Sequence, residues 1–422
     1  MGAIPEGFHR KAVRMTLVLA LRNIFRNRAR SLITLGAVAF GAVSLIQSGG
    51  FITDTVVQFR ERFIRIQVGH LQMFAPRYYE EGVARPYDFL IPDPAAVIRD
   101  VRAVPGVHNA VPRLSFAGLI GNEETSVPFL GTGIDPAAEM EVRDDLYMFF
   151  GKNLEPGDDQ EVILGKGLAE AIEAKVGDLL VITGHTAQDR TNYMEARVKG
   201  VFGSTSQEYD ALGIRMPLKR VQTFLRTEGA HVVVVYLDRT ADTDRIRGEV
   251  LRRPAVAGAG FNVKTWRELP EADFILKTGP FFESMFSVLK IIIGIIGVLC
   301  VFNTMNMAVL ERVGEIGTMM ALGTRRVRIL ALFLLEGLFI GIVGGLAGVA
   351  GGVVLAWGIS LVGIRMPKPP GLNVHWIAHI AVVPGLLVFA LGLSVVTAVV
   401  SSVIPAWKAS RLETGEALRH NI

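Results

Sequence analysis

The sequence predicts a membrane α-helical protein with four transmembrane helices and a large α+β domain inserted between helices 1 and 2. Half of its 422 residues are hydrophobic and its mean hydropathy is +0.39, values that soluble proteins seldom reach. Long uncharged runs lie towards both ends, whereas the stretch from about Asp54 to Leu276 has the composition of a soluble domain. The chain is therefore expected to be partly embedded in a membrane.

Four segments reach the roughly 20 apolar residues that a helix needs to cross a bilayer. They are residues 31–53, 285–310, 329–362 and 376–404. The first is expected to remain as an anchor, because it is longer than the apolar part of a signal peptide and lacks a small-residue cleavage pattern. The domain between the first two spans then covers residues 54–284.

Charged residues beside the spans predict the orientation. The chain before the first span carries seven basic residues opposed by one acid, Glu6: Arg10, Lys11, Arg14, Arg22, Arg26, Arg28 and Arg30. Because basic flanks stay inside, the N-terminal segment 1–30, the loop 311–328 and the tail 405–422 are expected in the cytoplasm. Residues 54–284 and the short loop 363–375 are expected outside, although Arg365 and Lys368 in that loop oppose the rule.

Residues 14–29 of the N-terminal segment are apolar on one side and rich in arginine on the other. Such a helix can lie in the plane of the lipid headgroups, and a simple positive anchor for the first span is an equal alternative. Since the basic residues gather beside apolar runs, the net charge of +4 indicates lipid headgroups as partners and disfavours nucleic acid. The single cysteine, Cys300, excludes an intrachain disulfide.

Residues 54–284 are expected to form a mixed α+β domain. Alternating or β-branched runs predict strands at His70–Phe74, Glu161–Leu164, Leu179–Thr183, Ala196–Phe202 and His231–Leu237. Helical spacing predicts helices at Pro94–Val104, Leu218–Arg226 and Ala241–Arg252, the last capped by Asp238 or Thr240.

The predicted cytoplasmic loop after the second span contains a short amphipathic helix. Ile316, Met319, Met320 and Leu322 give it an apolar strip, Gly323 can end it in a left-handed conformation, and Thr324 can cap the next helix. A short helix held at both ends by membrane helices is suited to transmit force from a partner. An ordinary polar turn with a helical extension is the alternative.

Glu311–Gly337, ERVGEIGTMMALGTRRVRILALFLLEG, resembles the signature of the FtsX/MacB/LolC–LolE superfamily of ABC transporter permeases, E-R-x-x-E-I-G-x-x-x-A-L-G before the third span. The strings LALRNIFRNRARSLITLGAVAFG, VILGKGLAEAIEAKVGDLLVI and SSVIPAWKASRLETGEALR resemble its first span, outer domain and C-terminal ending. One departure is Thr414-Gly415, where a proline pair is usual. The resemblance covers both ends, all four spans and part of the insertion.

The resemblance implies a partnership with two copies of a separate ABC ATPase and with a second permease, identical or paralogous. Its coupling motif matches Glu311, Arg312, Glu315, Gly317 and Gly323, and with Met319 and Met320 these residues are expected to contact the ATPase. Arg312 and Glu315 would pair with charges of the ATPase. The insertion would form a porter-like lobe interrupted by a second lobe at about 115–228.

Chemistry on this chain is disfavoured. The sequence contains no G-x-x-x-x-G-K-[ST] phosphate loop, so ATP and Mg²⁺ are expected on the partner subunit, with no cofactor in this chain. Neither H-E-x-x-H nor G-x-S-x-G occurs, which disfavours an enzyme. His375 and His379 lack a third ligand, so no metal is expected.

The string GHLQMFAP, followed by Tyr78 and Tyr79, resembles an element of the lipoprotein-releasing LolC/LolE type. The resemblance implies an inner-membrane protein with a periplasmic domain that releases lipid-anchored cargo, with a periplasmic lipoprotein carrier as a further partner. Cargo is expected to enter sideways between the first two spans near four residues: Gln47, Phe51, Phe282 and Phe286. Two alternatives remain, a MacB-like efflux permease with a periplasmic adaptor and an FtsX-like regulator of a cell-wall hydrolase.

Two features of the spans have their own interpretation. Five glycines in the third span overlap in G-x-x-x-G spacings, which predicts close helix packing: Gly341, Gly344, Gly345, Gly348 and Gly352. Lys290, near the outer end of the second span, is expected to reach towards the lipid headgroups, with a grip on an anionic lipid or substrate as the alternative.

Overall fold

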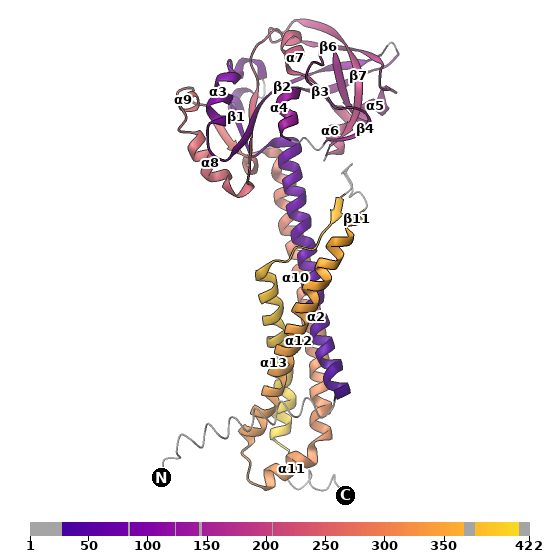
Figure 1. Cartoon of the computed structure of the whole chain (residues 1–422), viewed down its shortest axis with the longest axis vertical. Helices are drawn as coiled ribbons and strands as arrows, with labels where there is room; N and C mark the ends of the chain where they lie inside the picture. The colour runs from indigo at the N-terminus through magenta and orange to yellow at the C-terminus, as the bar shows by residue number, and fades with distance from the viewer. Residues whose placement is uncertain are drawn as a thin grey trace. The chain divides into compact units, whose positions relative to one another are not determined.

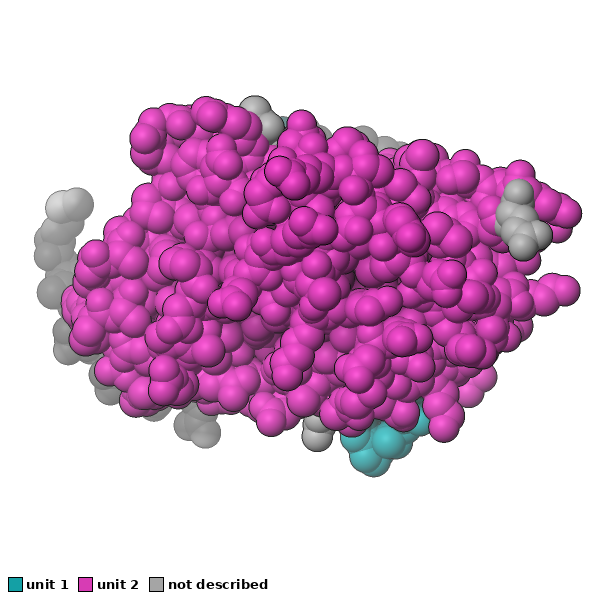
Figure 2. Space-filling model, turned by 90° about the horizontal axis from the view of Figure 1, so that it is seen from above, with its two compact units in different colours: residues 1–56, 279–364, 377–422 teal, residues 57–278, 365–376 magenta. Residues whose placement is uncertain are grey.

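A computed structural model of the protein describes residues 28–82, 85–122, 124–142, 146–204, 206–366 and 376–412. The chain forms two compact units, residues 1–56, 279–364 and 377–422 (unit 1) and residues 57–278 and 365–376 (unit 2), coloured separately in Figure 2. Nearly all of the predicted N-terminal segment 1–30, most of the loop 363–375 and much of the tail 405–422 lie outside the described residues, as does His375.

Unit 1 is helical (Figure 1). Its elements are parts of α2 (Arg28–Phe63) and α10 (Asp273–Glu311), with α11 (Val313–Ala321), α12 (Arg326–Val362) and α13 (Pro384–Ser410). Four stretches of the described chain are helices long and apolar enough to cross a membrane: Ser31–Val68, Pro270–Glu311, Arg326–Val362 and Pro384–Ser410. The predicted fold class, four apolar helices with a large domain between the first and second, is confirmed.

The fourth helix begins later than predicted. Residues Trp376–Ala378 form the short strand β12, which pairs with β11 (Ile364–Met366), and α13 starts at Pro384. Proline is favoured at the first helical position, because its fixed φ suits the helix and its missing N–H would have no partner there. The boundary at residue 376 was wrong because apolar composition alone does not distinguish a strand from a helix.

The glycines of α12 form two contact rows. A Cβ added at Gly348 would lie 2.6 Å from Ala42 Cβ of α2, and one added at Gly341 would lie 2.8 Å from Val395 Cα of α13. Gly344 and Gly352 face α2, and Gly345 faces α13. The helix packing predicted from the G-x-x-x-G spacings is therefore confirmed, and one buried cluster takes a side chain from every long helix: Val38, Val301, Met305, Ile340 and Ala398.

Unit 2 is built on one mixed sheet with the strand order β10-β1-β9-β2-β3-β8-β5-β7-β4, and β6 pairs with β2 and β7. The strands are β1 (Leu71–Phe74), β2 (Val107–Gly121), β3 (Ser126–Ile134), β4 (Tyr147–Gly151), β5 (Glu161–Gly165), β6 (Leu179–His185), β7 (Thr191–Gly203), β8 (Gly213–Pro217), β9 (Val232–Leu237) and β10 (Asn262–Thr265). All five predicted strands are present. The β3–β8 and β5–β7 pairs are parallel, and the other pairs are antiparallel.

Short helices cover this sheet: α3 (Pro94–Arg102), α4 (Pro136–Glu141), α5 (Lys166–Ala171), α6 (Gln207–Leu212), α7 (Leu218–Leu225), α8 (Thr243–Val250) and α9 (Pro254–Ala257). The helices predicted near α3, α7 and α8 are confirmed. The predicted cap of α8 was wrong, since its N-cap is Asp242, without a side-chain hydrogen bond, after a 3₁₀ turn at Thr240–Asp242. That turn uses the backbone of Thr240, whose carbonyl accepts from the Thr243 hydroxyl.

Strand β2 joins two regions of the hydrophobic core. Its residues Val107–Arg113 pair with β9, whereas Arg113–Gly121 pair with β3. Before Arg113, Ala110 packs in a cluster that includes Leu71 and Val235. After Arg113, Leu114 packs in a second cluster that includes Leu225. Arg113 is thus the residue at which β2 changes partners. The second lobe expected at about 115–228 stays a prediction.

Candidate functional site

The connection between α10 and α12 is a short helix, α11, that packs against the other helices of unit 1. Ile316 of α11 is 1% exposed, and Met319 and Met320 are partly buried. They lie in one apolar cluster with residues of α10, α12 and α13: Val309, Ile329, Phe333, Ala406 and Ala409. Three apolar side chains on one side of the helix therefore hold α11 to the ends of the long helices.

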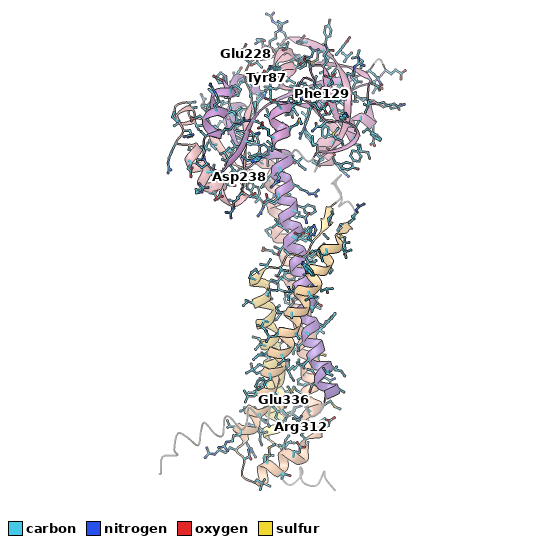
Figure 3. All side chains as sticks on the ribbon, in the orientation of Figure 1. Tyr87, Phe129, Glu228, Asp238, Arg312 and Glu336 are labelled. Carbon is cyan, nitrogen blue, oxygen red and sulfur yellow. The ribbon has the colours of Figure 1, made fainter. Side chains whose placement is uncertain are left out.

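A buried ion pair fixes the start of this helix. Arg312 Nη1 lies 3.3 Å from Glu336 Oε2 of α12, and both residues are below 10% exposed (Figure 3). The Arg312 side chain thus joins α11 to α12, and its predicted contact with the ATPase stays a prediction. Glu336 was missed, although an acidic residue in an otherwise apolar run is itself a signal for a buried partner.

The end of α11 is a rigid stop. Gly323 takes a φ of 87°, as predicted, its N–H donates to the Met320 carbonyl and the N–H of Thr324 donates to the Met319 carbonyl, each at 3.0 Å. These two bonds form the Schellman motif, which satisfies the last carbonyls of a helix. The predicted cap at Thr324 was wrong, since α12 starts after Arg325 and its cap has no side-chain hydrogen bond. The backbone N–H of Thr324 instead completes the turn that ends α11.

The opposite side of α11 faces outwards. Glu315, Thr318 and Leu322 are exposed at positions i, i+3 and i+7, and Leu322 is 83% exposed. Leu322, which was predicted to share the apolar strip of Ile316, lies instead on this exposed side, because position i+7 of a regular helix falls on the same side as Glu315. Glu311 is exposed and Gly317 is buried. The outward side of α11 thus presents a carboxylate and an exposed leucine side chain, on a helix whose two ends are held in place.

Of the four residues predicted for cargo access, Gln47 and Phe286 lie at contacts between helices of unit 1. Gln47 Nε2 donates to the Gly352 carbonyl of α12 at 2.8 Å, so its amide faces the third long helix. Phe286 packs on α2, since a Cβ added at Gly49 would lie 2.7 Å from its ring. Phe51 follows Gln47 by one helical turn, and Phe282 packs edge-on to Phe281 at 5.8 Å. Lateral access at these residues stays a prediction.

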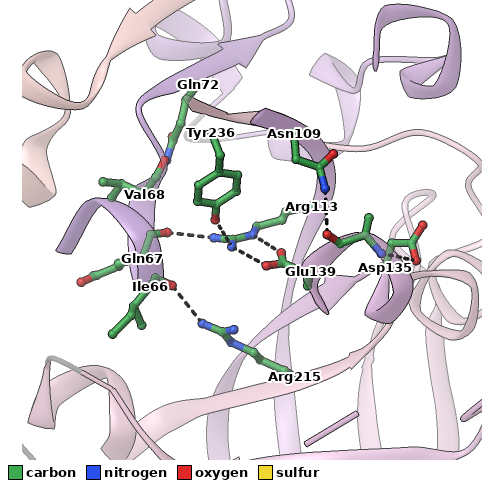
Figure 4. Close-up of polar contacts among 11 residues, drawn as sticks. Ile66, Gln67, Val68, Gln72, Asn109, Arg113, Asp135, Glu139, Arg215 and Tyr236 are labelled. Carbon is green, nitrogen blue, oxygen red and sulfur yellow. Dashed lines mark hydrogen bonds and ion pairs between the residues drawn. The ribbon is translucent and has the colours of Figure 1, made fainter. Parts of the chain in front are cut away.

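In unit 2, two buried arginines hold the end of a helical segment. After α2 the chain makes a π-helical turn, Ile64–Val68, that ends at Gly69 with a φ of 71°. Arg113 Nη1 donates to the Gln67 carbonyl at 2.8 Å, and Arg215 Nη2 donates to the Ile66 carbonyl at 3.3 Å (Figure 4). Carbonyls at a helix end lack partners within the helix and attract cations, so both contacts are favourable.

Arg113 is anchored by its own partners. Its guanidinium donates to both carboxylate oxygens of Glu139 at 2.8 and 3.1 Å and to the Tyr236 hydroxyl at 2.7 Å. Glu139 follows the capped start of α4, where Asp135 accepts from two backbone N–H groups. This network was not predicted, since the signal in the sequence is only an arginine within an apolar strand.

The two arginines also line a cavity of about 580 Å³ within unit 2. Aromatic rings form part of its wall, including Phe74 stacked on Tyr78 at 4.9 Å. His231 lies at the same wall, where its Nδ1 accepts from the Ser115 N–H at 3.1 Å. Burial lowers the pKa of His231 to about 4, so this ring is neutral near pH 7.

The fold and the helical connection define a class of protein, a membrane permease with a large domain between its first two spans. Residues 31–253 match the family model of the MacB-like periplasmic core domain, and residues 287–414 match that of the FtsX-like permease C-terminal domain. The chain belongs to the MacB/LolC/FtsX superfamily of ABC transporter permeases. The resemblance stated from the motifs is confirmed.

Three relatives show the range of the superfamily. The chain is 27% identical over 277 residues to an uncharacterized ABC transporter permease, MJ1507, of Methanocaldococcus jannaschii, covering 64% of each chain. It is 26% identical to the lipoprotein-releasing system transmembrane protein LolC of Xylella fastidiosa, over 75% of this chain and 78% of the relative. It is 24% identical to the macrolide export ATP-binding/permease protein MacB of Bartonella henselae, over 96% of this chain and 59% of the relative.

The chain thus spans less than two thirds of the archaeal relative and of MacB. Among solved structures, the extracellular domain of the transporter YknZ aligns with 46% of this chain at 18% identity and a TM-score of 0.35.

Within the described residues, no group of three or more His, Cys, Asp or Glu side chains is placed to hold a metal ion.

Proposed function

We propose that this chain is the permease subunit of a mechanotransmission ABC transporter and releases lipid-anchored proteins from the outer leaflet of an inner membrane. ATP is bound and hydrolysed by a separate subunit, which receives α11 in a cleft. Closure of two ATPase copies pushes α11 and moves the first and second spans, and with them the extracytoplasmic domain. The N- and C-termini lie in the cytoplasm.

The mounting of α11 is the observation that carries this proposal. A helix that transmits a push must not yield at its ends, and α11 has a buried ion pair at its start and a Schellman turn at its end. Its outward side carries Glu315 and the bare side chain of Leu322. An exposed leucine beside a carboxylate suits a partner cleft with an apolar floor and a basic rim.

A MacB-like efflux permease with a periplasmic adaptor is the second candidate. It is favoured by the match to MacB, which extends over 96% of this chain, whereas LolC matches 75%. Affinity purification of the tagged membrane complex separates the two, because lipoproteins with an ATPase support release, whereas an adaptor and an outer-membrane duct support efflux. Purification without any ATPase would contradict both.

We predict that Glu315→Lys reduces recovery of the ATPase with the tagged chain at least about ten-fold, because it reverses a charge at the centre of the proposed contact. The measurement is the ratio of ATPase to permease after purification. Glu208→Lys, the same change on the exposed side of α6 in unit 2, serves as the matched control and leaves the ratio unchanged. Equal ratios for both variants would show that α11 is not the docking element.

A further inference from the structure

We infer that a groove between α10 and α13 binds a membrane phospholipid, with its phosphate on Lys290 and one acyl chain along the groove. Lys290, Ile291 and Gly294 of α10 face Phe389 and Leu393 of α13 around a hollow of about 540 Å³. This inference depends on α10 crossing a membrane and is independent of the cargo.

The position of Lys290 matches the level of the lipid headgroups. The 20 residues between Lys290 and Glu311 carry no charge. At 1.5 Å per residue they span about 30 Å, the thickness of the hydrocarbon core of a bilayer. Lys290 therefore lies at one boundary of the hydrocarbon, on the side where α10 leaves unit 2, and Glu311 lies at the other.

The groove continues from Lys290 into the hydrocarbon. Its wall on α10 ends at Leu299 and its wall on α13 ends at Thr397. Leu299 follows Lys290 by nine helical positions, a length of about 13 Å, which is close to the depth of one leaflet. Gly294 deepens the groove, since a Cβ added there would meet no atom within 4 Å. The hollow thus has the length and the apolar lining of a site for one acyl chain.

The charge of Lys290 selects the headgroup. Its ammonium lies 4.9 Å from the Phe286 ring centroid and 5.5 Å from that of Phe389, so two aromatic faces hold it over the mouth of the groove. Within the described residues, no carboxylate lies within 4.0 Å of Lys290 Nζ. A cation at the edge of a membrane needs a counter-charge, and a lipid phosphate at this level supplies it.

The test uses the full chain in phosphatidylcholine nanodiscs that contain a phosphatidylglycerol with a photoactivatable acyl chain. After illumination, mass spectrometry compares label on residues 287–299 and 389–397 with label on the exposed side chains near Val354 and Leu361 of α12. We expect enrichment on the groove in the natural chain. Lys290→Gln lowers that ratio about five-fold, the factor that corresponds to about 1 kcal/mol per lysine at a lipid surface, whereas Lys290→Arg keeps it.

A second pair of variants tests the groove without touching the charge. Gly294→Leu fills the hollow and is expected to remove the enrichment, whereas Gly392→Leu, on an exposed position of α13 outside the lining, leaves it unchanged. Unchanged label in both Lys290→Gln and Gly294→Leu overturns the inference. Two further results would overturn it. If the groove stays unlabelled while α12 is labelled, a second copy of the chain covers the groove. If a triacylated lipopeptide displaces the label, the groove is a cargo site.

Discussion

At the scale of single residues, Arg312 and Glu336 show how a membrane protein places charge. Two ionised groups below 10% exposure are costly to bury, and their mutual attraction offsets this only while both are present. Their separation of 24 positions joins the connecting helix to the third long helix. The ion pair therefore contributes more to the position of α11 relative to α12 than to net stability.

We predict that Arg312→Met lowers the free energy of unfolding by about 3–5 kcal/mol, because it removes the guanidinium that lies 3.3 Å from the buried Glu336 carboxylate. The double variant Arg312→Met/Glu336→Met recovers most of that loss, since methionine fills the space without a charge. Thermal unfolding of the purified chain in detergent compares the three proteins. An equal loss in the single and double variants would mean that the guanidinium acts through packing and not through Glu336.

At the scale of elements, α12 owes its central place to glycine. Its two glycine rows let α2 and α13 approach with their backbones nearly in contact, which side chains of any size would prevent. Between membrane helices the gain is close packing, since lipid offers no hydrophobic drive for association. Small residues on one helix thus set the arrangement of three.

We predict that Gly348→Ala lowers the free energy of unfolding by about 1–3 kcal/mol, because the new methyl would overlap Ala42 and the Ala39 backbone. Gly358→Ala on the same helix is the matched control. A Cβ there meets no atom within 4 Å, so alanine is neutral or stabilises the helix by up to about 1 kcal/mol. Thermal unfolding in detergent measures both, and similar losses at the two positions would contradict the contact rows.

At the scale of the whole molecule, unit 2 depends on neutral histidines inside its core. Burial lowers the pKa of His70 to about 4, with the nearby Glu61 carboxylate opposing the shift. The ring accepts from the Leu237 N–H at Nδ1, and its Nε2 lies 3.0 Å from the Thr240 hydroxyl, which donates to Glu61. His231 is buried in the same way. Protonation of either ring therefore lowers the stability of the folded domain.

The sign of the pH effect follows from these values. An unfolded histidine takes up a proton near pH 6.5, whereas His70 and His231 in the folded domain do so near pH 4. Between these values the unfolded chain binds more protons than the folded chain. The contribution of the two histidines to the free energy of unfolding is therefore fully present above pH 6.5 and falls as the pH drops towards 4. The slope is about 2.7 kcal/mol per pH unit for the two groups together.

Thermal unfolding of the full chain in detergent between pH 7 and pH 5 measures this slope. Tryptophan fluorescence monitors the unfolding, since Trp266 is buried in unit 2. His231→Gln is expected to halve the slope, because it removes one of the two groups. His185→Gln, a change at an exposed ring, leaves the slope as it is. A natural chain with a flat profile between pH 6.5 and 5 would contradict the buried neutral histidines.

Most elements of this protein could be predicted because their signals are local. Runs of apolar residues identified the four long helices, alternating or β-branched runs identified strands such as that at Glu161–Leu164, and glycine spacing identified the packing rows of α12. The left-handed Gly323 followed from a glycine at the end of an amphipathic helix. Each of these depends on residues within a few turns of one another, so the order of residues by itself determined them.

Only the tertiary structure decided which polar groups meet. Arg113 and Arg215 donate to the end of one helical segment across separations of 46 and 149 positions, and Arg312 pairs with the buried Glu336 of α12. Leu322 faces outwards because it lies on the side of α11 opposite Ile316, the side that packs on the long helices. Such pairings depend on how strands and helices cross, and burial makes each one obligatory, since a charge removed from water must find a partner wherever the fold provides one.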